Sequence, residues 1–456
     1  MKSQSRPIPR RTFLASAAAL AVAPAALAAA RRPALSSINV GVIGCGGRGT
    51  GAAMDALNAN PATRIVGLAD LVPDRLASSR RHLVGEEEFA GRVALADDHC
   101  LTGFDAYRRL LDRPEIDAVI IAGPPGFRPA QIEAAVDAGK HVFAEKPVAV
   151  DPVGVRRVIA AAEKADREGL CIVAGTQRRH EASYLEAMRR IRGERHAASG
   201  PDQSGVGEEG ALGRIVSARC YWNQGGLWVH ARRPEYTDME WQCRNWLYFT
   251  WLSGDHIVEQ HIHNLDVINW ALGAVPLRCT GVGGRQVRTG PEYGNIYDHF
   301  GLEFEYPGGV SVLSMCRQID GTPPRVEEVI VGTRGVATLR PGFARIDGAG
   351  SSAPDANAGG GSSGEPWRYS GPNPSPYVQE HVALFSAIAE GRRVNEGRRV
   401  AESTLTAIMG RTAAYTGQSV TWAQMVASEQ DLTPPRLAFG DLPVAEVAMP
   451  GRTKVI

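Results

Sequence analysis

Short apolar runs alternate with amphipathic segments between residues 38 and 174 of the chain. The apolar runs have the length of buried strands, and the segments between them show helical periodicity. Strands that alternate with helices predict an α/β fold with a doubly wound parallel sheet. The predicted strands are 38–44, 64–70, 116–122, 141–144 and 170–174, and the predicted helices are 50–60, 129–138 and 151–168.

The pattern changes after Gly213, where strand-like runs follow one another with little helix between most of them. Gly-rich turns at 306–309 and 332–335 are typical of hairpins, so this part predicts an open antiparallel sheet in an α+β domain. We expect a first domain at 38–178, a second at 179–375, and helices within 376–420 that return to the first. The predicted strands are 215–222, 277–287, 299–306, 310–317 and 325–331, the predicted helices 378–390 and 401–415, and the predicted Gly-, Ser- and Pro-rich loops 193–210 and 348–376.

Composition excludes several classes of protein. The 456 residues carry 50 basic and 49 acidic side chains, so no overall positive field attracts nucleic acid. The seven cysteines are an odd number without paired spacing, which disfavours a disulfide framework or a zinc ribbon. We expect most of them to be small buried apolar side chains.

The first thirty residues have the pattern of an export signal. A twin-arginine pair, Arg10-Arg11, precedes an aromatic residue and a run rich in Ala, Leu and Val that ends near Ala30. This pattern predicts a twin-arginine signal peptide and a periplasmic or extracellular protein with no membrane association after cleavage. The alternative is a short membrane anchor, although about sixteen mildly apolar residues fall short of a bilayer span.

A glycine-rich turn follows the first predicted strand. Gly44, Cys45, Gly46, Gly47, Arg48 and Gly49 match G-x-G-x-x-G, and the motif opens a helix. Gly44 allows the turn, Gly46 admits a pyrophosphate, and Gly49 lets the helix pack closely on the sheet. Asp70, at the end of the second strand, is placed to bind ribose hydroxyls and favours NAD over NADP. Because Arg48 and Arg75 lie nearby in sequence, NADP stays possible.

The other end of this domain carries Glu145-Lys146-Pro147 directly after a predicted parallel strand. Ligands of doubly wound sheets bind at the carboxyl edge of the strands, which places Glu145 and Lys146 beside the dinucleotide. Pro124, after the third apolar run, lies at the same edge. Alone the tripeptide is weak evidence, because most lysines are solvated surface charges.

These motifs, with His263-Asn264-Leu265-Asp266 further along, resemble the glucose-fructose oxidoreductase, inositol dehydrogenase and MocA (Gfo/Idh/MocA) family. The resemblance extends from Ile38 to about Tyr415. It implies a Rossmann domain followed by an open antiparallel sheet, a sugar or polyol substrate, and a homo-oligomer. It also implies a tightly held NAD(P) in exported members and a Lys146 that orders the substrate hydroxyl near the nicotinamide.

The segment 255–272 reads as one helix that ends at Gly273. His256, Glu259, His263 and Asp266 share one face of that helix. We interpret His263 as the acceptor of the hydroxyl proton during hydride transfer, and Glu259 as the group that orients it or shares the proton. A solvated face is the alternative, and a metal site is a third, loosely spaced one that we do not adopt.

Two stretches depart from the family pattern or leave the substrate contacts open. Glu259 stands where members usually have Asp, and Gly123 and Arg128 replace a usual Thr and His. Arg178 aligns with an arginine that reaches substrate hydroxyls, with an inter-domain salt bridge as the alternative. Trp222 leads a Trp-rich stretch (Trp228, Trp241, Trp246 and Trp251) that predicts either sugar stacking or packing between domains.

The sequence predicts a carbohydrate-directed NAD(P)-dependent oxidoreductase. Two other functions fit the same motifs. One is a glycoside-cleaving or epimerising enzyme that reduces and reoxidises a bound NAD within each turnover. The other is a non-catalytic NAD-binding protein, for which Lys146 and His263 would be dispensable.

Overall fold

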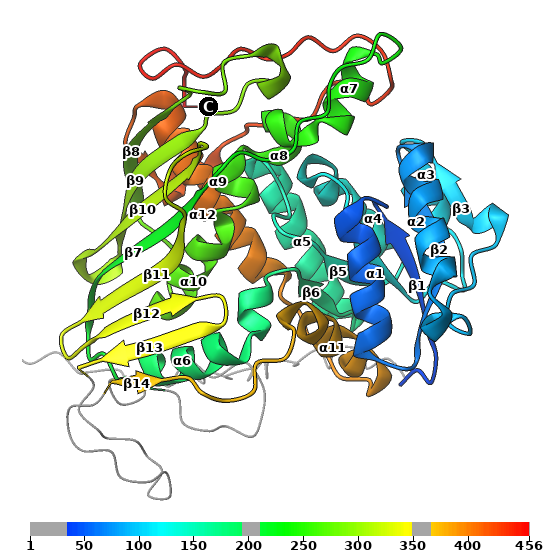
Figure 1. Ribbon diagram of the computed structural model, residues 1–456, viewed down its shortest axis with the longest axis horizontal. Coiled ribbons are helices and arrows are strands. Elements are labelled where there is room, and N and C mark those ends of the chain that lie inside the picture. The colour runs from blue at the N-terminus through cyan, green and yellow to red at the C-terminus, as the bar shows by residue number, and fades with distance from the viewer. Residues whose placement is uncertain (1–33, 194–209, 349–365, 456) are drawn as a thin grey trace, which may run out of the picture.

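The computed structural model describes residues 34–193, 210–348 and 366–455. The predicted signal peptide and most of both predicted Gly-rich loops lie outside these residues, so the structure does not bear on them. Figure 1 shows two sheets side by side, with helices between them and on the outer face of the N-terminal sheet. Within the described residues, no helix has the length and apolarity that a membrane crossing requires.

The N-terminal domain is a Rossmann fold. Its sheet has six parallel strands within the described residues, in the order β3-β2-β1-β4-β5-β6. The order reverses between β1 and β4, and this is where such sheets bind ligands. The elements are β1 (Ile38–Ile43), α1 (Gly47–Ala59), β2 (Thr63–Asp70), α2 (Pro73–Gly85), β3 (Cys100–Thr102), α3 (Ala106–Leu111), β4 (Ala118–Ile121), α4 (Arg128–Asp137), β5 (His141–Ala144), α5 (Pro152–Glu168) and β6 (Ile172–Ala174).

The C-terminal domain contains a mixed sheet of nine strands within the described residues, in the order β14-β13-β12-β11-β7-β10-β9-β8-β15. Its helices are α6 (Ala182–Arg192), α7 (Asp238–Arg244), α8 (Thr250–Ser253), α9 (His256–Glu259), α10 (Ile262–Leu272), α11 (Pro376–Ala389), α12 (Gly397–Thr416) and α13 (Trp422–Ala427). Its strands are β7 (Ile215–Gln224), β8 (Arg278–Gly284), β9 (His299–Tyr306), β10 (Val310–Gln318), β11 (Arg325–Gly332), β12 (Val336–Arg340), β13 (Phe343–Asp347), β14 (Trp367–Arg368) and β15 (Val420–Thr421).

The predicted open antiparallel sheet is confirmed, with one parallel strand pair that the sequence pattern did not indicate. Strands β7 and β10 are parallel, whereas every other neighbouring pair of this sheet is antiparallel in the described residues. The chain leaves β7, forms helices α7 to α10, and returns through β8 and β9 before β10. A long crossover of this kind permits a parallel neighbour, and a hairpin does not.

The helices after residue 375 lie against both domains. Leu384, Phe385 and Ile388 of α11 belong to the same buried cluster as Val40 and Leu68 of the Rossmann sheet. Helix α12 contacts α5 on the Rossmann side and β8 and β9 on the other side, so it lies between the two sheets (Figure 1). The two domains therefore share a continuous core beneath the carboxyl edge of the parallel strands.

The segment predicted as one helix over 255–272 is divided. Helix α9 ends at Glu259, and α10 starts at Ile262. At the break, the buried His261 ring lies 2.7 Å from the hydroxyl of Ser314 in β10, which ties this part of the backbone to the sheet. Asp255, before α9, has a φ of 75°, a conformation that only glycine adopts readily. The predicted continuous helical face is wrong, and its four polar residues are directed differently.

Candidate active site

The glycine-rich turn leaves room for a phosphate group. Gly44 has a φ of 95°, and a β-carbon on Gly49 would lie 1.7 Å from the carbonyl oxygen of Gly44. By contrast, a β-carbon on Gly46 or Gly47 would meet nothing within 4 Å. Two glycines are therefore required for the turn and for close packing, and the other two face open space at the N-terminus of α1. The turn fits a dinucleotide pyrophosphate.

Asp70 is held rigidly at the end of β2. Its Oδ2 accepts from the backbone N–H of Cys45 at 2.6 Å, and its Oδ1 accepts from that of Val72 at 2.7 Å. Burial raises the pKa of this carboxyl, although both backbone hydrogen bonds oppose that shift. The remaining lone pairs face the adjoining cavity, where ribose hydroxyls would need acceptors.

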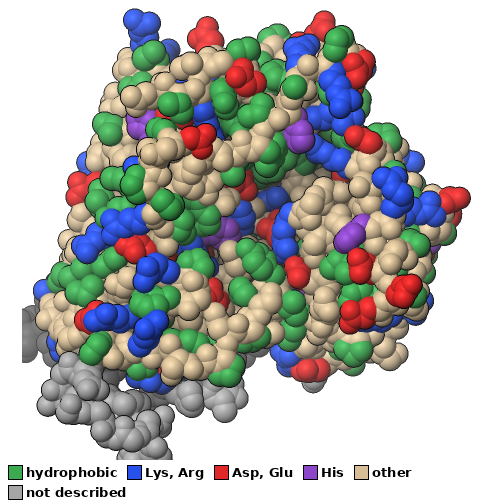
Figure 2. Space-filling view, viewed as in Figure 1, with side chains coloured by type: hydrophobic (Ala, Val, Ile, Leu, Met, Phe, Trp, Pro, Cys, Tyr) green, Lys and Arg blue, Asp and Glu red, His purple; other side chains and the backbone are tan. Residues whose placement is uncertain are grey.

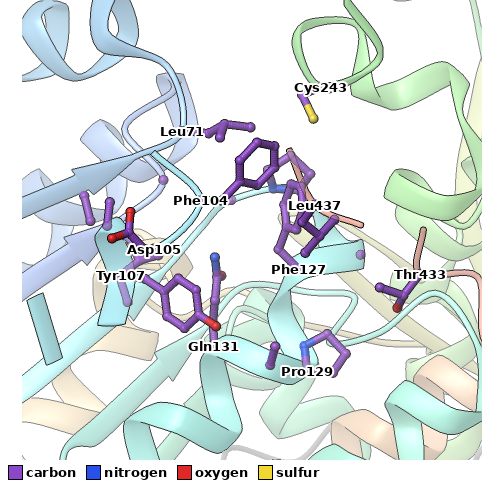
Figure 3. A pocket seen from close by; sticks show the side chains of 18 of the residues that line it. Leu71, Phe104, Asp105, Tyr107, Phe127, Pro129, Gln131, Cys243, Thr433 and Leu437 are labelled. Carbon is purple, nitrogen blue, oxygen red and sulfur yellow. The ribbon is translucent and has the colours of Figure 1, made fainter. Parts of the chain in front are cut away.

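That cavity starts at the switch point of the sheet and has a volume of about 340 Å³. Gly44, Asp70, Gly123 and Pro124 line it where β1, β2 and β4 end. From there it extends between the amino ends of α3, α4 and α5, as the side chains in Figure 3 show. The cavity therefore continues away from the glycine turn, on the side of Asp70.

Arg48 corrects one detail of the predicted cofactor site. Its guanidinium forms ion pairs with Glu145, Asp55 and Glu380, of which the last two are 3.0 and 2.9 Å long. The charge of Glu145, together with that of Glu380, keeps the pKa of Arg48 above its usual range despite the opposing effect of burial. Only the backbone of Arg48 belongs to the phosphate-binding turn. Its side chain links α1 to β5 and α11, so the guanidinium is already paired and not available to bind a 2′-phosphate.

Arg128, which replaces the usual histidine, is buried beneath the end of β4. It donates to the carbonyl oxygens of Gly123, Glu145 and Pro147 at 2.9, 3.0 and 2.7 Å. Burial lowers its pKa to about 10. Because these carbonyls belong to the two loops at the carboxyl edge, Arg128 fixes the positions of both loops, including the Glu145-Lys146-Pro147 turn.

Lys146 and Glu259 meet across the domain boundary. The Nζ of Lys146 lies 3.0 Å from Oε1 of Glu259 and donates to the carbonyl oxygen of the same residue at 2.7 Å. Their side chains are 11% and 12% exposed. This ion pair joins the end of β5 to the end of α9. Figure 2 shows a hollow in the surface of the molecule with charged side chains in it.

His263, on the first turn of α10, is nearly buried and stacks on Trp222 of β7 with ring centroids 5.6 Å apart. Burial lowers its pKa well below the usual value, and the nearby charge of Lys146 adds to the effect. Its Nδ1 has no hydrogen-bond partner among the described residues. The structure thus brings a neutral imidazole close to the charged pair of Lys146 and Glu259. Glu259 contacts Lys146, and no hydrogen bond joins it to His263 in the described part of the chain.

The other two polar residues of the predicted face have structural contacts. His256 is buried with its ring edge against Phe300. Asp266 accepts from Arg179 at 2.8 Å and from the hydroxyl of Ser403 at 2.7 Å. No side-chain hydrogen bond or ion pair joins either of them to Glu259 or His263 in the described residues, which contain no cluster of His, Cys, Asp or Glu suited to a metal ion. All seven cysteines lie in the described residues, where none forms a disulfide and six are buried.

Arg178 is 2% exposed and forms an ion pair with the buried Glu328 of β11. Its guanidinium also lies 5.4 Å from the ring centroid of Trp222. These contacts match the inter-domain salt bridge that the sequence left open, and they leave Arg178 as a support for Trp222. No sequence pattern pointed to Glu328, because glutamates in a strand are usually solvated.

The remaining tryptophans are mostly packing residues. Trp241 is buried, and Trp246 and Trp251 pack in the same cluster, which lies beside the cavity with Phe104 and Phe127. The packing alternative is therefore the better description of these side chains, and Trp222 is the one that contacts His263.

Comparison with known families agrees with this geometry. A model described as "Oxidoreductase family, NAD-binding Rossmann fold" matches residues 38–173, and one described as "GFO/IDH/MocA C-terminal domain" matches residues 206–338. The chain belongs to the Gfo/Idh/MocA family. The two matches cover the Rossmann sheet and the central strands of the second sheet, and both stop before the C-terminal helices.

Among curated relatives, 2,7-anhydro-N-acetylneuraminate hydratase of Escherichia coli is 28% identical over 42% of this chain and 44% of its own length. A glycosyl hydrolase family 109 protein of Streptomyces niveus is 33% identical over 29% of this chain and 25% of its own. The chain therefore spans less than half the length of these relatives.

Solved structures with the same fold match this chain over nearly the whole of their own length. The aldose-aldose oxidoreductase of Caulobacter crescentus, complexed with glycerol, has a TM-score of 0.61 at 19% identity, with 84% of this chain and 99% of that chain covered. A levoglucosan dehydrogenase in complex with NADH and levoglucosan has a TM-score of 0.62 at 20% identity, with the same coverage. At these identities the likeness establishes the fold alone.

Proposed function

We propose that this protein is an NAD-dependent oxidoreductase that transfers a hydride between a hydroxyl-bearing carbon of a sugar or polyol and the nicotinamide. The observation that carries the proposal is the meeting of Lys146, Glu259 and the neutral His263 at the carboxyl edge of a dinucleotide-binding sheet. The carbohydrate-directed names of several relatives and structural neighbours support the substrate class.

The side chains suit the oxidation of an alcohol. Lys146, positioned by its ion pair with Glu259, donates a hydrogen bond to the substrate oxygen and stabilises the negative charge that develops there. His263 accepts the hydroxyl proton, since a neutral imidazole carries one unprotonated ring nitrogen. When bound, the oxidised nicotinamide supplies the acceptor for the hydride, so the products are a carbonyl compound, reduced cofactor and a protonated imidazole.

The site favours NAD over NADP. Asp70 presents a carboxylate where a 2′-phosphate would lie, and the side chain of Arg48 is engaged by three other carboxylates. Arg75 lines the same cavity but donates to the backbone carbonyl of Arg244 at 2.9 Å. A 2′-phosphate would thus meet the Asp70 carboxylate, with Arg75 as a cation on the same cavity wall.

Family 109 glycosyl hydrolases among the relatives favour a second candidate function. In that reaction the same groups would oxidise a glycoside, and the hydride would return to the sugar after the glycosidic bond is cleaved. The predicted twin-arginine signal fits either function, because that route exports folded proteins with their cofactor in place. We propose that the protein is a simple oxidoreductase and that it acts after export by the twin-arginine route.

One experiment separates these functions. The mature protein is purified, its dinucleotide is identified by mass spectrometry, and absorbance at the wavelength of reduced nicotinamide is followed as monosaccharides, cyclitols and glycosides are added. Net reduction by a free sugar or cyclitol supports the proposal. Release of an aglycone without net reduction supports the second function. Bound cofactor with no turnover on any compound would favour a non-catalytic role.

A further inference from the structure

The last part of the chain, after α13, returns to the Rossmann domain without a helix or strand of its own in the described residues (Figure 1). Several hydrogen bonds fix it there. The backbone N–H of Leu432 donates to Asp151 at 2.9 Å, and Gln242 of α7 donates to the carbonyl oxygen of Leu442 at 2.7 Å. This segment lies beyond both family-model matches, the second of which ends at residue 338.

The segment covers the cavity that begins at Asp70. Asp431, Thr433 and Leu437 of this segment line the cavity together with residues of α3 and α4. Phe439 packs edge-to-face on Phe104, with ring centroids 5.2 Å apart. In Figure 3 the side chain of Leu437 lies next to the rings of Phe104 and Phe127 at the top of the cavity. The C-terminal segment therefore forms a roof, apolar at Leu437 and Phe439, over a cavity whose floor belongs to the Rossmann domain.

Gln131, on α4, has an unused hydrogen-bonding group in this cavity. The residue is 8% exposed, and its Oε1 has no partner among the described residues. Its carboxamide points into the space between Phe104 and Tyr107 (Figure 3). A buried carboxamide without a partner is costly, so its orientation indicates a ligand with complementary groups. A carboxamide, which both donates and accepts, matches the N6 and N7 edge of adenine.

The neighbouring groups fix which part of a dinucleotide reaches Gln131. A pyrophosphate at Gly46 and a ribose on Asp70 leave the adenine to extend past Asp70 into the roofed cavity. We propose that Gln131 recognises the adenine edge there, and that residues 431–439 close over the ring so that the cofactor leaves only when this segment lifts. The inference rests on the proposed function in one respect, namely that the chain binds a nicotinamide dinucleotide.

Nicotinamide hypoxanthine dinucleotide tests the recognition step, because its 6-oxo group replaces the amino donor of adenine. We expect the wild-type protein, stripped of cofactor, to bind NAD about tenfold more tightly than the hypoxanthine analogue. Gln131→Leu should bring the two dissociation constants to within about twofold. Gln418→Leu, at an exposed glutamine on the turn after α12, is the matched control and should keep the difference.

The roof is tested by the rate of cofactor release. Phe439 is 41% exposed, so Phe439→Ala removes its contact with Phe104 without opening the core. We expect release of NAD, followed by stopped-flow fluorescence, to become about tenfold faster. Val444→Ala is a control at an equally exposed residue of the same segment, away from the cavity, and should leave the rate unchanged.

The outcomes distinguish this inference from the proposed function. Binding of NAD with equal affinity for the analogue, or discrimination that survives Gln131→Leu, overturns the role of Gln131. Release rates that match between Phe439→Ala and Val444→Ala overturn the roof. In both cases the oxidoreductase proposal stands. Failure of the wild-type protein to bind either NAD or NADP overturns both, provided that circular dichroism shows a folded protein.

Discussion

The two ends of the cofactor cleft contain different kinds of side chain. At the reaction end, Lys146 from β5 and Glu259 from α9 form an ion pair between the domains, next to the neutral His263. At the adenine end, Phe104, Phe127 and Leu437 lie around Gln131, and the roof belongs to the C-terminal segment. An ion pair between the domains therefore marks one end, and aromatic and apolar side chains cover the other.

This difference predicts that the residues that carry the reaction are separate from the residues that retain the cofactor. Changes to the ionisable groups should alter turnover and its response to pH, and should leave cofactor binding nearly intact. Changes to the aromatic roof should alter how long the cofactor stays, and should leave the chemical step nearly intact. The predictions below test the charged end, from the largest expected effect to the smallest.

Removal of the Lys146 ammonium should have the largest effect. Lys146→Ala deletes the hydrogen-bond donor to the substrate oxygen and leaves Glu259 without its partner. We expect kcat/KM to fall by about 10²- to 10⁴-fold, while the dissociation constant for NAD changes by less than about tenfold. Steady-state kinetics and calorimetric titration measure the two quantities.

Lys164→Ala is the matched control, because Lys164 also forms an ion pair with a carboxylate but lies on the outside of α5. It should leave both quantities unchanged. An equal loss of NAD binding and turnover in Lys146→Ala would show that the two ends are not functionally separate.

Asp255 should make stability at the reaction end depend on pH. It is fully buried at the start of α9, where it accepts from the N–H of Tyr297 at 2.7 Å and from the hydroxyl of Tyr415. Burial raises its pKa from 3.8 to about 6. Between these values the native state binds a proton that the unfolded chain has released. Raising the pH from about 4 to about 7 should therefore lower the free energy of unfolding by up to about 3 kcal/mol.

Denaturant unfolding of wild type and Asp255→Asn across this pH range measures the effect. The variant is less stable throughout, since an amide cannot accept all of the hydrogen bonds. The difference in unfolding free energy between the two proteins should shrink by about 3 kcal/mol from pH 4 to pH 7. A difference that stays constant would mean that Asp255 is ionised over the whole range.

The Rossmann sheet was the more predictable half of the fold. Its longer strands are continuous apolar runs, and the glycine turn and Asp70 lie at fixed spacing along them. Strand β3, of three partly buried residues, carries too short a pattern to be recognised. In the second domain the parallel pairing of β7 with β10 depends on the crossover between them, which periodicity does not record.

The site also contains residues that the sequence predicts and residues that it does not. Lys146, Glu259 and His263 could be named from motifs, but the partner of Glu259 could not, because the break between α9 and α10 depends on a contact of His261 with the sheet. Arg178 was assigned to the substrate or to a salt bridge, and only the fold chose Glu328 as its partner. Gln131 gave no signal, because its significance lies in the absence of a hydrogen-bond partner within the described structure.

Asp70 lies between the two ends, and its replacement should have the smallest effect. Asp70→Asn removes the negative charge next to the ribose and keeps most of the side-chain shape. We expect the ratio of kcat/KM for NAD to that for NADP to fall by about tenfold, because the 2′-phosphate no longer meets a carboxylate. Asp74→Asn, on the same turn but 67% exposed and paired with Arg244, is the control that should leave the ratio unchanged. If Asp70→Asn also leaves it unchanged, Arg75 already balances the carboxylate, and the charge that selects the cofactor lies on α2 and not on β2.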